Sequence, residues 1–129
     1  MKITKLIILL SLVILIGCEE KPMDMEDTIY DYYDYLFGGE LEKSQEILEW
    51  DNKLASIIDY YSTMSTLNTN RMRIKDIVIT SIQEDHGKGM ATVNIIYEHS
   101  NKNEVIEKNR IHLILKNKDE WKITSIIRE

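Results

Sequence analysis

The feature that most constrains the fold of this chain is a change in the spacing of its apolar residues near residue 70. Before that point apolar residues recur every three or four positions, which is typical of amphipathic helices. After it β-branched residues alternate with polar ones, which is typical of strands that bury one face. The chain is therefore expected to form its helices first and its strands afterwards.

The second half of the sequence predicts four strands joined by three short turns. The strands are expected at residues 72–83, 90–99, 104–116 and 120–128. The turns are expected at residues 85–89, 100–103 and 117–119. Connections this short join antiparallel neighbours, so the four strands should form a meander. One face of that sheet is apolar and needs a cover.

The first half supplies the cover in the form of three predicted helices. They are expected at residues 27–37, 40–49 and 51–67. Each helix has one apolar stripe and must pack that stripe on another element. The predicted fold class is α+β, with N-terminal helices packed on a curved four-stranded antiparallel meander, all within a single domain at residues 27–129.

The N-terminal segment has the pattern of a cleaved signal peptide. Lys2 and Lys5 make the first residues positively charged, and residues 6–16 form an apolar run that is too short to span a bilayer. The sequence Leu-Ile-Gly-Cys, which ends at Cys18, resembles the lipobox of bacterial lipoproteins. The resemblance implies that residues 1–17 are removed and that Cys18 is lipidated. An ordinary secretion signal with an incidental cysteine is the alternative.

Lipidation at Cys18 predicts where the chain works. One acyl chain binds a membrane only marginally, whereas two or three hold a protein there stably. Residues 18–26 are acidic after the cysteine and contain the single proline, so they are expected to form a solvated tether. The predicted location is extracytoplasmic, on the cell membrane or the outer membrane, with membrane lipid as the partner at Cys18. The sequence leaves open which membrane and which leaflet.

The charge balance argues against a nucleic-acid partner. The chain has a formal net charge of −6, and its lysines and arginines are scattered along the sequence. A phosphate-binding surface needs these residues in clusters. Cys18 is the single cysteine, so the domain that follows it has no thiol for a disulfide or a metal site.

Two segments of the predicted domain resemble one family of small cone-shaped folds. Residues 33–44, YDYLFGGELEKS, are similar to the family's first helix, its glycine break and the start of its second helix. Residues 119–123, DEWKI, are similar to its final strand. The family includes nuclear transport factor 2, ketosteroid isomerase and many small bacterial lipoproteins. A cystatin-like arrangement is the competing assignment, because it would produce the same periodicities.

Catalytic chemistry is not visible in the residue pattern. The isomerases of the family imply a carboxylate base in the cone with hydrogen-bond donors facing it. The candidates by residue type are Asp59, Asp76, Tyr60 and Tyr97. No spacing singles out one of them, and none of the three histidines has a partner at metal-ligand spacing. We therefore expect no catalytic residues, no metal and no cofactor, and we predict that the chain is not an enzyme.

Three functions remain open for the predicted domain, of which a non-enzymatic module that binds an envelope protein or a second copy is favoured. Such a partner would cover apolar residues on the outer sheet face. These residues are Ile96, Ile106, Ile114 and Ile126. The second function is a small-molecule binder with an aromatic pocket. The residues expected to line it are Tyr60, Tyr61, Tyr97 and Trp121. The third is an isomerase or lyase, which needs a buried carboxylate in that pocket.

The aromatic residues also have a simpler interpretation. Helical spacing would send some of the tyrosines into the core and leave others on the surface. Trp121 would then anchor the last strand against the helices, without contacting a ligand.

Overall fold

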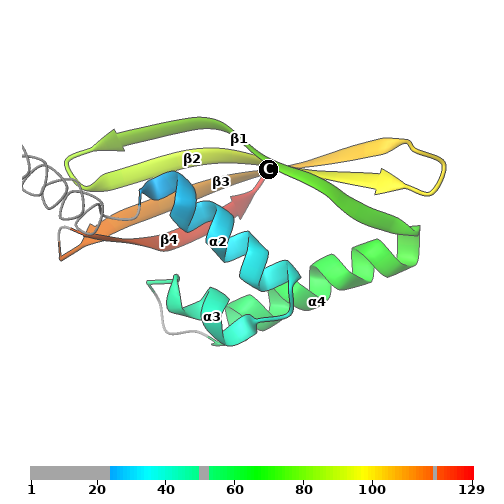
Figure 1. Cartoon of the computed structure of the whole chain (residues 1–129), viewed down its shortest axis with the longest axis horizontal. Coiled ribbons are helices and arrows are strands. Elements are labelled where there is room, and N and C mark those ends of the chain that lie inside the picture. The colour runs from blue at the N-terminus through cyan, green and yellow to red at the C-terminus, as the bar shows by residue number, and fades with distance from the viewer. Residues whose placement is uncertain (1–23, 50–52, 118) are drawn as a thin grey trace, which may run out of the picture.

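The computed structural model describes residues 24–49, 53–117 and 119–129, with residues 53–56 described by their backbone. The helices in these ranges are α2 (Met25–Phe37), α3 (Leu41–Glu46) and α4 (Lys53–Asn70). The strands are β1 (Met72–Asp85), β2 (Lys88–His99), β3 (Glu104–Lys116) and β4 (Glu120–Arg128). In Figure 1, α2 lies across the sheet and α4 runs beside it toward the end that carries the β2–β3 turn. The predicted α+β fold, with helices before a four-stranded meander, is confirmed.

The four strands form one antiparallel sheet in the order β1-β2-β3-β4. β3 and β4 have the predicted bounds, whereas β1 and β2 are both longer than predicted. They extend because Asp85 pairs with Lys88, which leaves His86 and Gly87 as a two-residue turn. Both turn residues have positive φ, 51° at His86 and 78° at Gly87, which a tight type I′ hairpin requires. The turn is therefore shorter than the loop predicted at residues 85–89, and that prediction is wrong.

The helices begin and end where local hydrogen bonds dictate. α2 begins at Met25, earlier than predicted, because the Asp24 carboxylate accepts a hydrogen bond from the backbone N–H of Asp27 at 2.8 Å. α4 continues beyond the predicted residue 67 to Asn70. Within the described parts of the chain, no helix is long and apolar enough to cross a membrane.

The segment after α3 joins the sheet, so α3 is shorter than the predicted helix at residues 40–49. The backbone N–H of Ile123 donates to the carbonyl of Ile47, and the N–H of Glu49 donates to the carbonyl of Ile123, both at 2.8 Å. Leu48 thereby forms a parallel bridge with Ile123. The short segment covers part of the free edge of β4, which would otherwise present unpaired backbone groups.

A β-bulge in β4 changes which side chains face the helices. Leu113 pairs with Ile123 and His112 pairs with Ser125, so Thr124 is an extra residue on β4. An extra residue inverts the alternation of the residues that follow it. Ile126 therefore lies opposite the buried Ile111 and packs against the core, which corrects the prediction that Ile126 belongs to the outer face.

The core forms where α2 packs on the inner face of the sheet. The buried hydrophobic side chains of α2 include Ile29, Tyr32, Tyr33 and Leu36. Those of the sheet include Val93, Ile95, Ile111, Leu113 and Ile123. Burial of this apolar surface is the main favourable contribution to folding. Trp121 is also buried and belongs to this core, in keeping with its predicted role as the anchor of β4.

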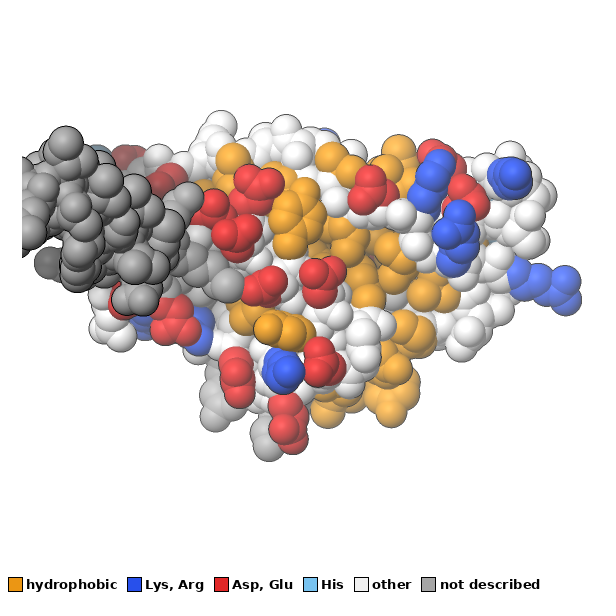
Figure 2. All heavy atoms as spheres, in the orientation of Figure 1, with side chains coloured by type: hydrophobic (Ala, Val, Ile, Leu, Met, Phe, Trp, Pro, Cys, Tyr) orange, Lys and Arg blue, Asp and Glu red, His pale blue; other side chains and the backbone are white. Residues whose placement is uncertain are grey.

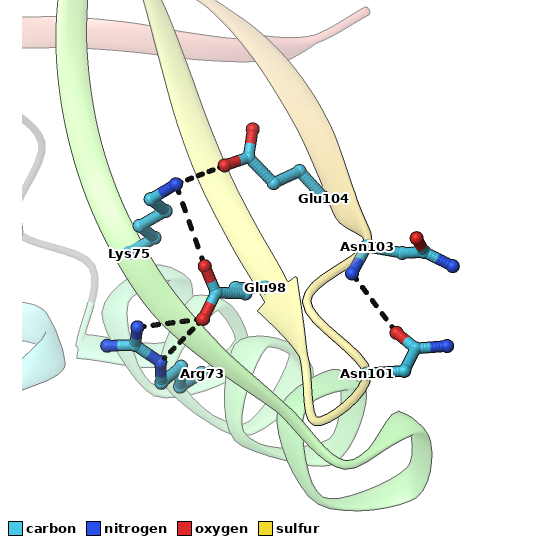
Figure 3. A network of polar contacts seen from close by, with 6 residues as sticks. All are labelled: Arg73, Lys75, Glu98, Asn101, Asn103 and Glu104. Carbon is cyan, nitrogen blue, oxygen red and sulfur yellow. Dashed lines mark hydrogen bonds and ion pairs between the residues drawn. The ribbon is translucent and has the colours of Figure 1, made fainter.

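An ionic network ties the other end of the sheet together, where β1, β2 and β3 extend past β4 (Figure 3). Arg73 on β1 contacts Glu98 on β2, with its Nη2 atom 2.8 Å from Oε1 of the carboxylate. Lys75 contacts Glu98 as well, at 3.6 Å, and also pairs with Glu104 on β3. The hydrogen bond from Arg73 holds the pKa of Glu98 below its ordinary value. The network thus links three strands across a solvent-exposed surface.

Candidate ligand-binding cavity

A small cavity of about 170 Å³ lies between α2, α4 and the inner face of the sheet. Its helical walls consist of Tyr32, Tyr33, Leu36, Phe37, Ile58, Asp59, Ser62 and Thr63. Its floor consists of Ile95, Glu107, Asn109, Ile126 and Arg128. Figure 2 shows hydrophobic side chains gathered on this side of the molecule, between the sheet and α4. The volume is close to the roughly 150 Å³ of cavities that hold a benzene-sized molecule.

Helical and strand geometry explain why these residues converge. Each helix contributes two adjacent residues and the two that follow four positions later, which lie on one helical face. On β3, Glu107 and Asn109 share the face of the buried Ile111, because alternate residues of a strand point to the same side. The inner face of β3 therefore changes from apolar to polar where it forms the cavity floor.

Tyr32 and Asp59 form the first polar contact of the cavity wall. The Tyr32 hydroxyl donates a hydrogen bond to Oδ2 of Asp59 at 3.3 Å, which joins α2 to α4. Burial raises the pKa of Asp59, and the hydrogen bond from Tyr32 opposes that rise. Burial, followed by the negative charge of Asp59, raises the pKa of Tyr32. Tyr32 therefore remains a protonated hydrogen-bond donor at neutral pH.

Asn109 and Tyr33 form the second polar contact, at the cavity floor. Asn109 is 4 % exposed, and its Nδ2 atom donates a hydrogen bond to the Tyr33 hydroxyl at 3.1 Å. Its Oδ1 atom is buried and has no hydrogen-bond partner among the described residues. Exchanging the two amide atoms by rotation would leave Nδ2 unpaired instead, because one phenol satisfies only one end of the amide. Burial raises the pKa of Tyr33, so its hydroxyl stays neutral.

Glu107 is held by two partners at the edge of the floor. Its Oε1 atom lies 2.6 Å from Nε of Arg128, and its Oε2 atom accepts a hydrogen bond from the Tyr97 hydroxyl at 3.1 Å. Burial raises the pKa of Tyr97, and the charge of Glu107 raises it further. Both carboxylate oxygens of Glu107 are thus occupied by protein groups.

The structure does not bring together the four aromatic residues predicted to line a pocket. Tyr60 is half-buried and packs against the core, whereas Tyr61 is 64 % exposed. Tyr97 is buried and reaches the cavity only through its hydrogen bond to Glu107. Trp121 borders a separate hollow that is formed with residues of α2 and α3. These four side chains therefore do not share one site.

The two carboxylates named as candidate bases have different surroundings. Asp59 lines the cavity. Asp76 is exposed and pairs with Ile96, so it lies on the outer face of the sheet. The residues expected from the sequence to line a pocket did not include Tyr32, Tyr33 or Asn109. The available signal was the pair of polar residues on β3, which interrupts a series of inward-facing apolar positions.

The described residues offer no assembled metal site. No group of three or more histidine, cysteine, aspartate or glutamate side chains among them could hold a metal ion. His86 is exposed and contacts Asp85. The Nδ1 atom of His99 lies 3.1 Å from the carbonyl of Asn70. Cys18 lies outside the described residues.

Comparisons with known proteins show the fold. No protein-family model matches the chain, and no curated protein matches its sequence. A SEC-C motif protein from Rhodopseudomonas palustris has a similar structure, with a TM-score of 0.61 and 9 % identity over 88 % of this chain and 84 % of that chain. A proposed ketosteroid isomerase from Shewanella frigidimarina has a TM-score of 0.58 and 14 % identity over 80 % of this chain and 92 % of that chain. The second likeness supports a cone-like α+β domain.

Proposed function

We propose that this chain is a bacterial lipoprotein, anchored to a membrane through Cys18, whose α+β domain binds a small molecule in the cavity between α2, α4 and the sheet. The observation that carries the binding proposal is the unpaired Oδ1 atom of Asn109 at the cavity floor. A buried acceptor without a partner costs about 1–3 kcal/mol. A ligand that donates a hydrogen bond to this atom would remove that cost.

The surroundings of Asn109 favour binding over a purely structural role for this region. Apolar side chains such as Ile95 and Ile126 line the cavity together with a few convergent polar groups, and small-molecule sites combine the two kinds of lining. The hydroxyl of Tyr32 and the amide of Asn109 are each held by a second residue, so their positions are fixed before a ligand arrives. Such preorganisation reduces the entropy lost on binding.

The alternative of a protein partner on the outer sheet face has less support. It was based on four isoleucines, of which Ile126 faces the core because of the bulge. Ile96 and Ile114 are only partly exposed, and Ile106 is 58 % exposed. Single exposed apolar residues are common on protein surfaces and do not define an interface.

Lipid anchoring is tested by labelling the full chain in a bacterium with a palmitate analogue. Cys18 is the single cysteine, so we expect the wild type to carry the label and to fractionate with membranes. Cys18→Ser should lose both properties, because the acyl chains supply the membrane affinity. A wild type without the label, or a labelled Cys18→Ser variant, would refute the anchor.

Ligand binding is tested with toluene, which fits the volume and makes no hydrogen bond. Adding toluene to the full chain in detergent should shift the NMR signals of cavity residues such as Ile95. Ser62→Phe places a ring in the cavity and should abolish those shifts. Ser65→Phe, on an exposed position of α4, is the matched control and should leave them unchanged. Equal shifts in the two variants would argue against binding in this cavity.

Proton transfer is a second candidate function, favoured by the position of Asp59. A carboxylate with a raised pKa beside a neutral phenol is an arrangement that suits general-base chemistry next to a carbonyl group. The likeness to a proposed ketosteroid isomerase agrees with this candidate at the level of fold. The test is exchange of the α-protons of cyclohexanone in D₂O. Acceleration by the wild type, lost in Asp59→Asn and kept in Asp76→Asn, would establish it, and no acceleration would reject it.

A further inference from the structure

The polar atoms of the cavity floor and wall differ in what they can offer to a ligand. Asn109 presents an unpaired acceptor, because its Nδ2 atom is used by Tyr33. The carboxylate of Asp59 uses Oδ2 to accept from Tyr32, and its Oδ1 atom has no hydrogen bond to the described residues. Each oxygen of Glu107 already contacts one protein group. The atoms left for a ligand at these three residues are therefore acceptors, which require a donor on the ligand.

The charges that line the cavity also favour a ligand that carries a hydrogen-bond donor. Two carboxylates line it, those of Asp59 and Glu107, against one guanidinium, that of Arg128. The guanidinium pairs with Glu107 and its charge also lowers the pKa of Asp59, but Asp59 forms no ion pair with a cation among the described residues. A cation is attracted to such a site, and an anion is repelled, more strongly than in water because nearby apolar groups lower the local dielectric constant.

From these two observations, we propose that the cavity selects compact apolar molecules that carry an N–H or O–H donor, with an ammonium group favoured over a carboxylate. The inference rests on the proposed ligand binding in this cavity. Asn109 accepts a hydrogen bond from the ligand at the floor, and Asp59 attracts its positive charge from the wall. The volume restricts the apolar part to about one six-membered ring.

Four probes of nearly equal size test the selectivity: benzylamine, benzyl alcohol, toluene and benzoate. Each is titrated into the full chain in detergent at low ionic strength, and its dissociation constant is measured from NMR shifts. We expect benzylamine to bind most tightly, followed by benzyl alcohol and then toluene. Each hydrogen bond or charge contact should give roughly a 10-fold change in affinity. Benzoate should bind more weakly than toluene.

Variants assign the selectivity to the two residues. Asn109→Leu should reduce the affinity for benzyl alcohol to that for toluene. Asn94→Leu is the matched control, because Asn94 also has an unpaired buried Oδ1 atom but does not line the cavity. Asp59→Asn should reduce the preference for benzylamine over benzoate by about 10-fold, and it tests the charge even if Asn109→Leu fails to fold.

The outcomes separate this inference from the proposed function. If toluene binds but benzyl alcohol binds no better, or if benzoate binds better than benzylamine, the inference is wrong while ligand binding stands. If none of the four probes shifts the signals of the cavity, both the inference and ligand binding are wrong. The expected order of affinities, together with its loss in the two cavity variants, supports the inference.

Discussion

The side-chain amide of Asn109 on β3 donates a hydrogen bond to the phenol of Tyr33 on α2 at 3.1 Å, between residues 76 positions apart in the sequence. Both side chains are buried. The contact fixes the part of α2 that forms the cavity wall over the strand that forms its floor. It also occupies one end of the Asn109 amide and leaves the other end for a ligand.

Removal of the Tyr33 hydroxyl should destabilise the fold. Tyr33→Phe keeps the ring and leaves the buried Nδ2 atom of Asn109 without its acceptor. We expect a loss of about 1–3 kcal/mol in the free energy of unfolding, measured by urea denaturation. Tyr61→Phe, on an exposed side chain, is the control and should change the stability by less than about 0.5 kcal/mol. Equal effects of the two variants would show that the contact contributes nothing.

The raised pKa of Asp59 predicts a specific pH dependence of stability. A carboxyl group with a higher pKa in the folded chain binds its proton more tightly when folded. Its contribution to the free energy of unfolding is therefore fully present below the ordinary pKa of 3.8 and is lost as the pH rises through the folded value. Asp59→Asn removes this loss, because the amide stays neutral and can still accept from Tyr32.

Urea denaturation of the wild type and Asp59→Asn at about pH 3 and about pH 7 measures this effect. The stability of the variant relative to the wild type should increase from the lower to the higher pH. Asp34→Asn, at an exposed position of α2, controls for the removal of one negative charge. A relative stability that stays constant or falls with rising pH would contradict the assignment.

The ionic network of the sheet should stabilise the fold in a salt-dependent way. Glu98 accepts contacts from both Arg73 and Lys75, so Glu98→Gln removes the charge at the centre of the network. We expect a small loss of stability at low ionic strength that disappears at about 1 M NaCl, where the Debye length is only about 3 Å. Glu84→Gln, on an exposed position of β1, is the comparison. A loss that persists in high salt would indicate another role for Glu98.

The local parts of the fold were predictable because they depend on neighbouring residues. Period-two alternation and short polar turns identified four strands, and the bounds of β3 and β4 agree with the structure. The cavity was not predictable in the same way. Tyr32 and Asp59 lie 27 positions apart, and their contact depends on how α2 and α4 pack on the sheet. Periodicity identifies the buried face of a helix but does not identify its partner.

The position of Ile126 was predicted wrongly for a related physical reason. Regular alternation from Ile123 places Ile126 on the outer face, and the sequence gives no clear sign that Thr124 is an extra residue. Thr124 donates a hydrogen bond from its hydroxyl to the carbonyl of His112 at 3.1 Å, which helps to hold the bulge. A bulge depends both on such local contacts and on the pairing register with the neighbouring strand. It is therefore difficult to detect from the sequence of one strand alone.

The bulge itself can be tested with two adjacent residues. Ile126 lines the cavity and packs against the core, whereas Ile127 is 49 % exposed on the opposite face. Ile126→Ser should lower the free energy of unfolding by about 1–2 kcal/mol, because it removes buried apolar surface. Ile127→Ser should cost less than about 0.5 kcal/mol. Urea denaturation measures both, and regular alternation without the bulge predicts the reverse order. A larger loss for Ile127→Ser would therefore place Ile126 on the outer face and remove part of the floor of the proposed cavity.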